Sequence, residues 1–145
     1  MKYSIIIPTL NEGKLLSELL SQLEIIKKNR AGEIEIIISD GGSNDDTLNI
    51  SLEYADKIIV HTGSTKQNIA MGRNSGAEIA EGAVLIFFNG DVSFDNVSDF
   101  FSYIDKYFWN KKYLAMTCKV KVFKNEEIIS DKVFHFVYNA YFHLL

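Results

Sequence analysis

Three polar clusters, each following an apolar segment, hold the residues that could carry out chemistry. They are Pro8-Thr9-Leu10-Asn11-Glu12, Asp40-Gly41-Gly42-Ser43-Asn44-Asp45-Asp46 and Asn89-Gly90-Asp91. Neighbouring carboxylates repel one another unless they share a positive charge, so such clusters favour a divalent cation. Magnesium or manganese, held by one or two carboxylates together with a substrate phosphate, fits this set of oxygen ligands.

Each candidate residue also has a purely structural explanation. Asp91 is the best candidate metal ligand because it follows an apolar strand closely, yet Asn-Gly-Asp is equally a common turn sequence. Asp40 could accept a hydrogen bond from the imide N–H of a nucleotide base, although on residue type alone a turn explains it better. Arg73 could bind phosphate or simply be solvated, and Asn11 and Glu12 also suit the start of a helix.

Other catalytic patterns are missing. The sequence contains neither G-x-G-x-x-G nor G-x-x-x-x-G-K-[ST], which excludes the usual dinucleotide and P-loop motifs. His61, His135 and His143 lack the spacing of zinc ligands. No nucleophile-elbow pattern is present, so nothing in the sequence indicates covalent catalysis.

The composition is that of one soluble globular domain. The 145 residues are 47% hydrophobic and 23% charged, and a net charge of −4 argues against a nucleic-acid binder. The single cysteine, Cys118, excludes an intramolecular disulfide and favours a reducing, cytoplasmic location. We find no signal peptide and no apolar run of about 18 residues.

Apolar periodicity predicts alternating strands and helices around these clusters. The predicted strands are Tyr3–Pro8, Glu33–Ser39, Lys57–His61 and Ala83–Phe88. The predicted helices are Asn11–Asn29, Ser43–Ala55 with a capping box at Ser43 and Asp46, Lys66–Ala80 and Asp95–Trp109. Leu114–Phe123 alternates like a half-exposed edge strand, and an amphipathic helix starts near Ser130.

This alternation predicts an α/β fold: an open, mostly parallel, Rossmann-like sheet with helices on both faces and room for one antiparallel edge strand. Ala83–Phe88 contains no polar residue, so we expect it at the centre of the sheet. Ligands of such sheets bind beyond the carboxyl ends of the strands, where all three polar clusters fall. The fold class and the clusters therefore agree on where a site should lie.

Taken together, three segments resemble the family 2 glycosyltransferases of the GT-A fold. The segments are SIIIPTLNEGKLLSELLSQL at Ser4–Leu23, EIIISDGGSNDDT at Glu35–Thr47 and RNSGAEIAEGAVLIFFNGDV at Arg73–Val92. They are similar, in order and spacing, to the family's P-x-x-N-E, D-D/G-G/S-S-x-D-x-T and R-N-x-G…D-x-D segments. Any one of these segments alone would be weak evidence for the family, and the resemblance is specific because all three occur in the same order.

The resemblance implies an enzyme that transfers a sugar from a nucleotide-diphosphate-sugar donor, usually a UDP-sugar, to an acceptor hydroxyl with inversion. It implies a divalent metal, Mn²⁺ or Mg²⁺, bound by Asp91. The residues that it assigns to donor binding are Pro8, Thr9, Asn11, Glu12, Asp40, Ser43, Arg73 and Asn89. Asp40 would read the base, and the acceptor would be a glycan or a lipid-linked molecule of the cell envelope.

The chain departs from the family pattern in two ways. Asn89 replaces the first aspartate of D-x-D, which removes one negative charge and should lower metal affinity. The family's downstream acidic motif is missing, and Glu126, Glu127 and Asp131 come too early to supply the general base. We therefore expect residues 1–145 to form a single donor-binding domain, cut off before the acceptor-binding half.

An alternative function remains open on the sequence alone. The apolar segment Val133–Leu145 needs a partner surface, such as a missing part of the domain, a second copy of the chain or the inner face of a membrane. The chain could then be an inactive donor-binding or assembly module that associates through this segment. A sugar-phosphate nucleotidylyltransferase fits less well, because the loop after the first strand is neither glycine-rich nor basic.

Overall fold

The computed structural model describes residues 2–109 and 114–118. The chain divides into two compact units, Met1–Ser102 and Tyr103–Leu145, and all three polar clusters belong to the first. Three predictions lie outside the described residues: the second half of the strand Leu114–Phe123, the helix from Ser130 and the contact through Val133–Leu145.

Strands and helices alternate through the first unit as predicted. In chain order the elements are β1 (Tyr3–Thr9), α1 (Gly13–Asn29), β2 (Ile34–Asp40), α2 (Thr47–Tyr54), β3 (Lys57–Val60), α3 (Ile69–Glu78), β4 (Val84–Phe87) and α4 (Val97–Tyr103). A π-helix over Ile104–Trp109 follows in the second unit.

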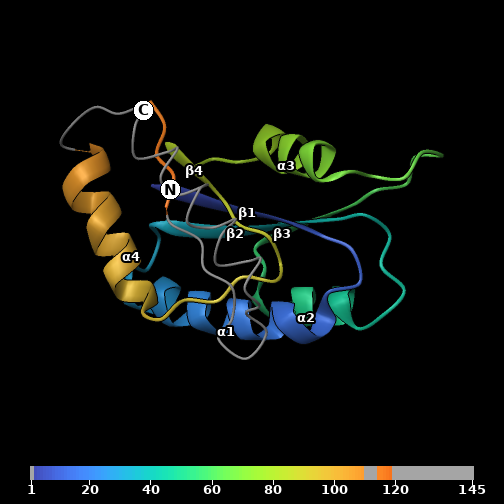
Figure 1. The fold of residues 1–145 in the computed structure, drawn as a ribbon, viewed down its shortest axis with the longest axis horizontal. Coiled ribbons are helices and arrows are strands. Elements are labelled where there is room, and N and C mark those ends of the chain that lie inside the picture. The colour runs from blue at the N-terminus through green and yellow to red at the C-terminus, as the bar shows by residue number, and fades with distance from the viewer. Residues whose placement is uncertain (1, 110–113, 119–145) are drawn as a thin grey trace, which may run out of the picture. The chain divides into compact units, whose positions relative to one another are not determined.

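The four strands form one parallel sheet in the order β3-β2-β1-β4. Figure 1 shows α1 and α2 on one face of this sheet and α3 on the other. The predicted α/β class, the parallel strands and the helices on both faces are therefore confirmed. In the register of β1 and β2, Thr9 is paired with Asp40, so the first two polar clusters start side by side.

The core forms because β1 and β2 are buried at every position and α1 supplies a stripe of leucines at helical spacing. The buried residues of α1 are Gly13, Leu16, Leu19, Leu20, Leu23 and Ile26. On the other face, α3 lies very close to β1 through two glycines. A Cβ at Gly76 would overlap Ile6, and one at Gly72 would lie 2.8 Å from the Cβ of Pro8.

Two expectations about individual elements differ from the described structure. β4 pairs with β1 alone among the described strands, so its central position stays a prediction, but Leu85 and Phe87 on one of its faces are about 40% exposed and not covered as expected. An apolar run shows that a strand has covered positions, but it does not give the strand's place in the sheet. The capping box is also absent: α2 begins only at Thr47, and the Ser43 hydroxyl bonds elsewhere.

The last predicted elements also differ from the structure. The helix predicted over Asp95–Trp109 is an α-helix only to Tyr103 and continues as a π-helix. Residues 114–118 are exposed and irregular, not the start of an edge strand. Periodicity over so few residues cannot distinguish a strand from an extended loop. Among the described residues, the structure contains no helix with the length and apolarity needed to cross a membrane.

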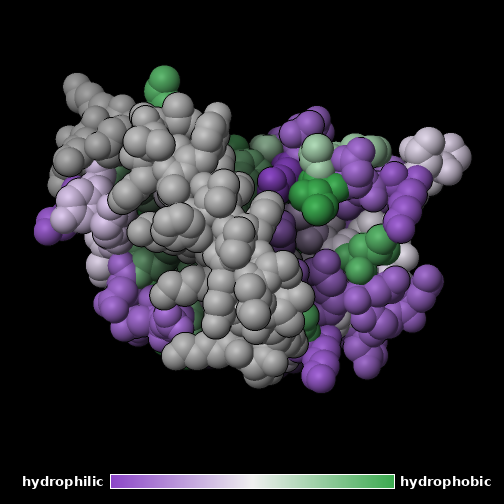
Figure 2. Space-filling view, viewed as in Figure 1, coloured by the Kyte–Doolittle hydropathy of each residue, from purple (hydrophilic) through white to green (hydrophobic). Residues whose placement is uncertain are grey.

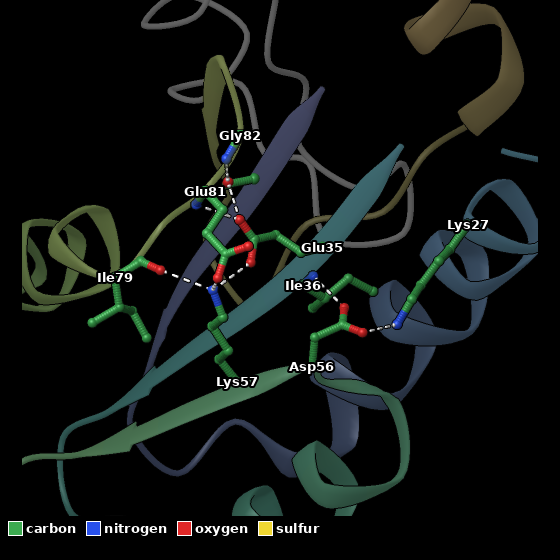
Figure 3. A network of polar contacts seen from close by, with 9 residues as sticks. Lys27, Glu35, Ile36, Asp56, Lys57, Ile79, Glu81 and Gly82 are labelled. Atoms are coloured by element: carbon green, nitrogen blue, oxygen red, sulfur yellow. Dashed lines mark hydrogen bonds and ion pairs between the residues drawn. The ribbon is translucent and has the colours of Figure 1, made fainter. Parts of the chain in front are cut away.

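The amino-terminal edge of the sheet is held by a polar network, drawn in Figure 3. The Glu35 carboxylate is 1% exposed, accepts a hydrogen bond from the Ser4 hydroxyl and is paired with Lys57 at 2.9 Å. Lys57 also bonds Glu81, and the backbone amides of Glu81 and Gly82 donate to Glu35 and Ser4. The network thus ties the turn between α3 and β4 to the sheet, at the edge opposite the polar clusters.

Candidate functional site

The three polar clusters meet at the carboxyl edge of the sheet, as the parallel topology requires. β1 lies between β2 and β4, so the loop after β1 can contact the loops after both neighbours. Figure 2 shows hydrophilic residues gathering on the right of this view, where Figure 1 has the loops that follow β1, β2 and β3. Hydrogen bonds join the first two clusters, and the Glu12 side chain lies against the third.

Asp40, at the end of β2, is completely buried and bonded on both carboxylate oxygens. Oδ1 accepts from the backbone amides of Gly42 and Ser43, at 2.9 and 2.8 Å. Oδ2 accepts from the hydroxyls of Thr9, at 3.1 Å, and Ser43. The structure therefore places Asp40, Thr9 and Ser43 together as predicted, but the carboxylate is directed at the protein's own loop. Its contact with a base stays a prediction.

Asn11 joins the first loop to the second. Its backbone amide donates to the Ser43 hydroxyl at 2.9 Å, and its side-chain oxygen accepts from the amide of Asn44 at 2.7 Å. Asn11 has φ of 56°, the left-handed region that asparagine tolerates better than most residues. A functional candidate from the sequence is thus also the residue that turns the chain into α1.

Asp45 and Thr47 cap the start of α1 from the second loop. The amide of Glu12 donates to the Thr47 hydroxyl at 3.0 Å, and the amide of Gly13 donates to Asp45 Oδ2 at 3.1 Å. Asp45 Oδ1 in turn accepts from the backbone amide of Thr47. Hydrogen bonds from Thr47 lower the pKa of the exposed Asp45 carboxyl. One carboxylate thus satisfies free amides at the starts of two helices.

The Glu12 side chain reaches the third cluster. Its carboxylate lies against Gly90, where a Cβ would overlap Oε2. Burial, together with repulsion by Asp91, raises the pKa of Glu12, while a hydrogen bond from the Gly90 amide acts in the opposite direction. Oε2 is buried and has no hydrogen-bond partner among the described residues. A buried carboxylate oxygen without a partner thus lies against the turn that carries Asp91.

Arg73 approaches the same cluster from α3. Its Nη2 donates to the side-chain oxygen of Asn89 at 3.0 Å, and its guanidinium lies 6.0 Å from the ring centre of Phe87. Nε is buried and has no partner within the part of the chain that the structure describes. Arg73 is therefore fixed beside the Asn89–Asp91 cluster with one donor still to satisfy.

The carboxylate oxygens of Glu12 and Asp91 fit a divalent cation that takes most of its ligands from a substrate. No group of three or more His, Cys, Asp or Glu residues within residues 2–109 and 114–118 is arranged to hold a metal by itself. Asp91, and the free oxygen of Glu12 beside it, are hard oxygen ligands of the kind that Mg²⁺ and Mn²⁺ bind through one or two carboxylates. A diphosphate would then have to complete the coordination.

Pro8 is buried and packs against Gly72 of α3, and its place in a nucleoside pocket stays a prediction. Gln67 was not predicted, yet its amide donates to the backbone oxygen of Ser39 at 3.1 Å and its Cβ would lie 3.5 Å from a Cβ at Gly41. The cap formed by Asp45 and Thr47 was not predicted either, although both residues stand in the quoted D-x-T segment. Side chains that bond across loops leave no periodic signal in a sequence.

Comparison with known proteins identifies the family of the chain. Residues 4–127 match the sequence model of the family described as "Glycosyl transferase family 2". A PGL/p-HBAD biosynthesis glycosyltransferase of Mycobacterium bovis (strain BCG / Pasteur 1173P2) is 36% identical over 95 residues, which are 63% of this chain and 36% of that protein. The poly(ribitol-phosphate) beta-N-acetylglucosaminyltransferase TarS of Staphylococcus aureus (strain Mu50 / ATCC 700699) is 30% identical over 112 residues, 74% of this chain and 19% of TarS.

Solved structures show the same fold. The crystal structure of S. aureus TarS 1–349 in complex with UDP-GlcNAc has a TM-score of 0.55 and 29% identity, and covers 73% of this chain and 32% of that one. The mannosyltransferase PcManGT from Pyrobaculum calidifontis has a TM-score of 0.58 at 18% identity, with 74% of this chain and 32% of that one covered, a likeness of fold alone. The chain spans about a third or less of these relatives. With a GT-A fold and a family match over residues 4–127, it belongs to glycosyl transferase family 2.

Proposed function

We propose that this chain is the donor-binding part of a metal-dependent, inverting glycosyltransferase that uses a nucleotide-diphosphate sugar, with UDP as the nucleotide. The observation that supports the metal is the Glu12 carboxylate, which lies against Gly90, the neighbour of Asp91 in the chain, and whose buried Oε2 has no hydrogen-bond partner among the described residues. TarS, the relative crystallised with UDP-GlcNAc, supports the choice of nucleotide. Inversion is supported only by the family resemblance.

Asp91 would hold the cation, with Glu12 next to it. The cation, when bound, would neutralise charge that develops on the diphosphate as the bond to the sugar breaks. Glu12 and Asp91 come from the loops after β1 and β4, which pair in the parallel sheet, and the contact of Glu12 with Gly90 holds the two loops together. A rigid placement of this kind raises the rate because the ligands need not be ordered during the reaction.

Arg73 and Asn89 would meet the donor from the side of α3. The buried Nε of Arg73 lacks a partner, and an anionic phosphate oxygen is the acceptor that a guanidinium binds best. The Asn89 oxygen accepts from Arg73, so its amide nitrogen can donate to a sugar hydroxyl or a ribose oxygen. These two residues would orient the donor, while the cation carries most of the charge.

The acceptor and the general base are outside this assignment. We expect a glycan or lipid-linked hydroxyl of the cell envelope as the acceptor; one relative is named for PGL/p-HBAD biosynthesis and another for transfer of N-acetylglucosamine to poly(ribitol-phosphate). A cytoplasmic location and an association with a membrane surface remain sequence predictions. The general base would come from residues beyond the three clusters, since both carboxylates near Gly90 serve the cation.

The proposal is tested by titrating the full chain with UDP, with and without MnCl₂, in a calorimeter. We expect binding that requires manganese. Asp91→Ala should abolish the manganese-dependent part, and Asp95→Ala, an exposed aspartate shortly after it, serves as the matched control and should bind as the wild type does. A folded wild-type protein that binds no UDP in manganese would contradict the proposal.

A further inference from the structure

Asp40 has no capacity left for a ligand. A carboxylate offers about four lone-pair sites. The amides of Gly42 and Ser43 and the hydroxyls of Thr9 and Ser43 use all four, and the side chain is 0% exposed. To bind a base, Asp40 would have to give up one of these bonds and gain access to the surface. The carboxylate is therefore arranged to organise the protein.

The bonds of Asp40 continue into the binding site through Ser43. The Ser43 hydroxyl gives its single proton to Asp40 Oδ2, so it presents a lone pair to the amide of Asn11 at 2.9 Å. That bond, with the one from the Asn44 amide to Asn11 Oδ1, fixes Asn11 in its left-handed conformation. Glu12, whose carboxylate lies against Gly90, is the next residue along the chain.

We propose that Asp40 is a positioning residue that acts through Ser43 and Asn11 to place Glu12, and that it does not read the nucleotide base. This inference rests on the proposed function and deepens it, since it assigns to Asp40 a role in holding the diphosphate and cation end of the site. It follows that replacing Asp40 weakens the binding of every nucleoside diphosphate by a similar factor. A residue that contacts the base would instead change which base is preferred.

The experiment measures the affinity of the full chain for UDP, CDP and GDP in MnCl₂ by calorimetry, for Asp40→Asn, Ser43→Ala and the double variant. Asp40→Asn keeps the shape of the side chain but replaces one acceptor oxygen by a donor. The matched control is Asp46→Asn, an exposed aspartate of the same loop whose side chain bonds only Asn49. Thermal unfolding followed by circular dichroism confirms that each variant is folded.

We expect Asp40→Asn to lower the affinity for all three nucleotides about tenfold, because a charge-assisted hydrogen bond is lost. The preference among the bases should not change. Ser43→Ala should lower the affinity for all three nucleotides by a smaller common factor. The double variant should be no weaker than Asp40→Asn alone, because the two residues act in series. Asp46→Asn should match the wild type.

Two results would overturn the inference. One is a changed base preference in Asp40→Asn while Ser43→Ala binds like the wild type; the other is strict additivity of the two substitutions. If Asp40→Asn does not fold, Ser43→Ala is the test, and an unchanged affinity of Ser43→Ala for all three nucleotides would contradict the positioning role of Asp40. A folded wild-type protein that binds none of them removes the proposed function and this inference with it, whereas an altered preference removes the inference only.

Discussion

The carboxylate of Glu12 occupies the space in which a side chain at Gly90 would have to lie. The two residues stand on loops that follow neighbouring parallel strands, β1 and β4. Their contact joins the first polar cluster to the third, because Gly90 is the middle residue of Asn89–Asp91. The geometry of the turn that carries Asp91 thus depends on the position of a residue about eighty positions earlier in the chain.

Gly90→Ala should disturb both partners. The added methyl must displace either Glu12 or the turn, which costs about 1–3 kcal/mol of stability in a close-packed place and moves Asp91. We expect a lower melting temperature and at least a tenfold loss of manganese-dependent UDP affinity. The double variant Glu12→Ala/Gly90→Ala should recover the melting temperature but not the affinity, as measured by circular dichroism and calorimetry. A single variant as stable as the wild type would contradict the contact.

Glu12 should make the unliganded protein less stable as the pH rises. Burial and the Asp91 charge raise its pKa in the folded state above the ordinary value of 4.5. The folded protein then binds more protons than the unfolded chain between the two pKa values, so stability falls as the pH rises through that window and stays lower above it. Glu12→Gln should remove this loss, as should MnCl₂ added to the wild type. Melting curves from pH 4 to pH 8 measure both effects, and identical pH profiles for wild type and variant would contradict the assignment.

Ser4→Ala should destabilise the fold without affecting the binding site. The buried Ser4 hydroxyl donates to the buried Glu35 carboxylate and accepts from the half-buried amide of Gly82, so its loss leaves both groups short of a partner. We expect a cost of about 1–3 kcal/mol in urea unfolding. Ser21→Ala, which removes an exposed hydroxyl bonded to one backbone oxygen, is the control and should change the stability by less than about 0.5 kcal/mol. Equal costs for the two serines would show that the network contributes little.

The same network gives a second pH dependence, of opposite sign. Burial acts to raise the pKa of Glu35, but hydrogen bonds from Ser4, the Glu81 amide and Lys57 outweigh it and lower the pKa below 4.5. A lowered pKa contributes stability that is present above pH 4.5 and is lost as the pH falls through the folded-state pKa. Glu35→Gln should therefore flatten the acid side of the stability profile, measured by urea unfolding between pH 2.5 and pH 6. An unchanged acid limb would contradict the pairing.

Asn89→Asp should strengthen metal binding, because it restores a negative charge beside Asp91. Arg73 already bonds the Asn89 oxygen at 3.0 Å and would neutralise part of the added charge. We therefore expect a gain of no more than about tenfold in manganese affinity in the presence of UDP. Calorimetry measures this, with Asn96→Asp, which changes a helix-capping asparagine, as the control. Weaker manganese binding would show that position 89 acts on something other than the cation.

The regular part of the fold could be predicted because its signals are local. Strands such as Tyr3–Thr9 and helices such as Gly13–Asn29 were located to within two residues, because burial of one or both faces requires a regular pattern of apolar residues in the sequence. The meeting of the polar clusters followed from the parallel topology. The exposure of one face of β4 and the change to a π-helix at Ile104 depend on packing between distant segments, which no window of sequence contains.

The chemistry of individual site residues was harder to predict. Ser43 was interpreted as a helix cap from the capping-box pattern, and the family resemblance assigned Asp40 to a base. The structure shows the two bonded to each other. Glu12 was assigned to nucleoside binding, and its contact with Gly90 has no counterpart in residue spacing. Motifs identify which residues gather at a site, but hydrogen-bond partners decide which of them remain free to meet a ligand.

The shared cap at Asp45 has a consequence for movement during the reaction cycle. The Asp45 side chain is bonded to the first turns of both α1 and α2. Neither helix can therefore move relative to the other without loss of one of these capping hydrogen bonds. The loops that follow β1 and β2 would therefore keep their relative positions, together with the first turns of α1 and α2, while a donor binds and leaves.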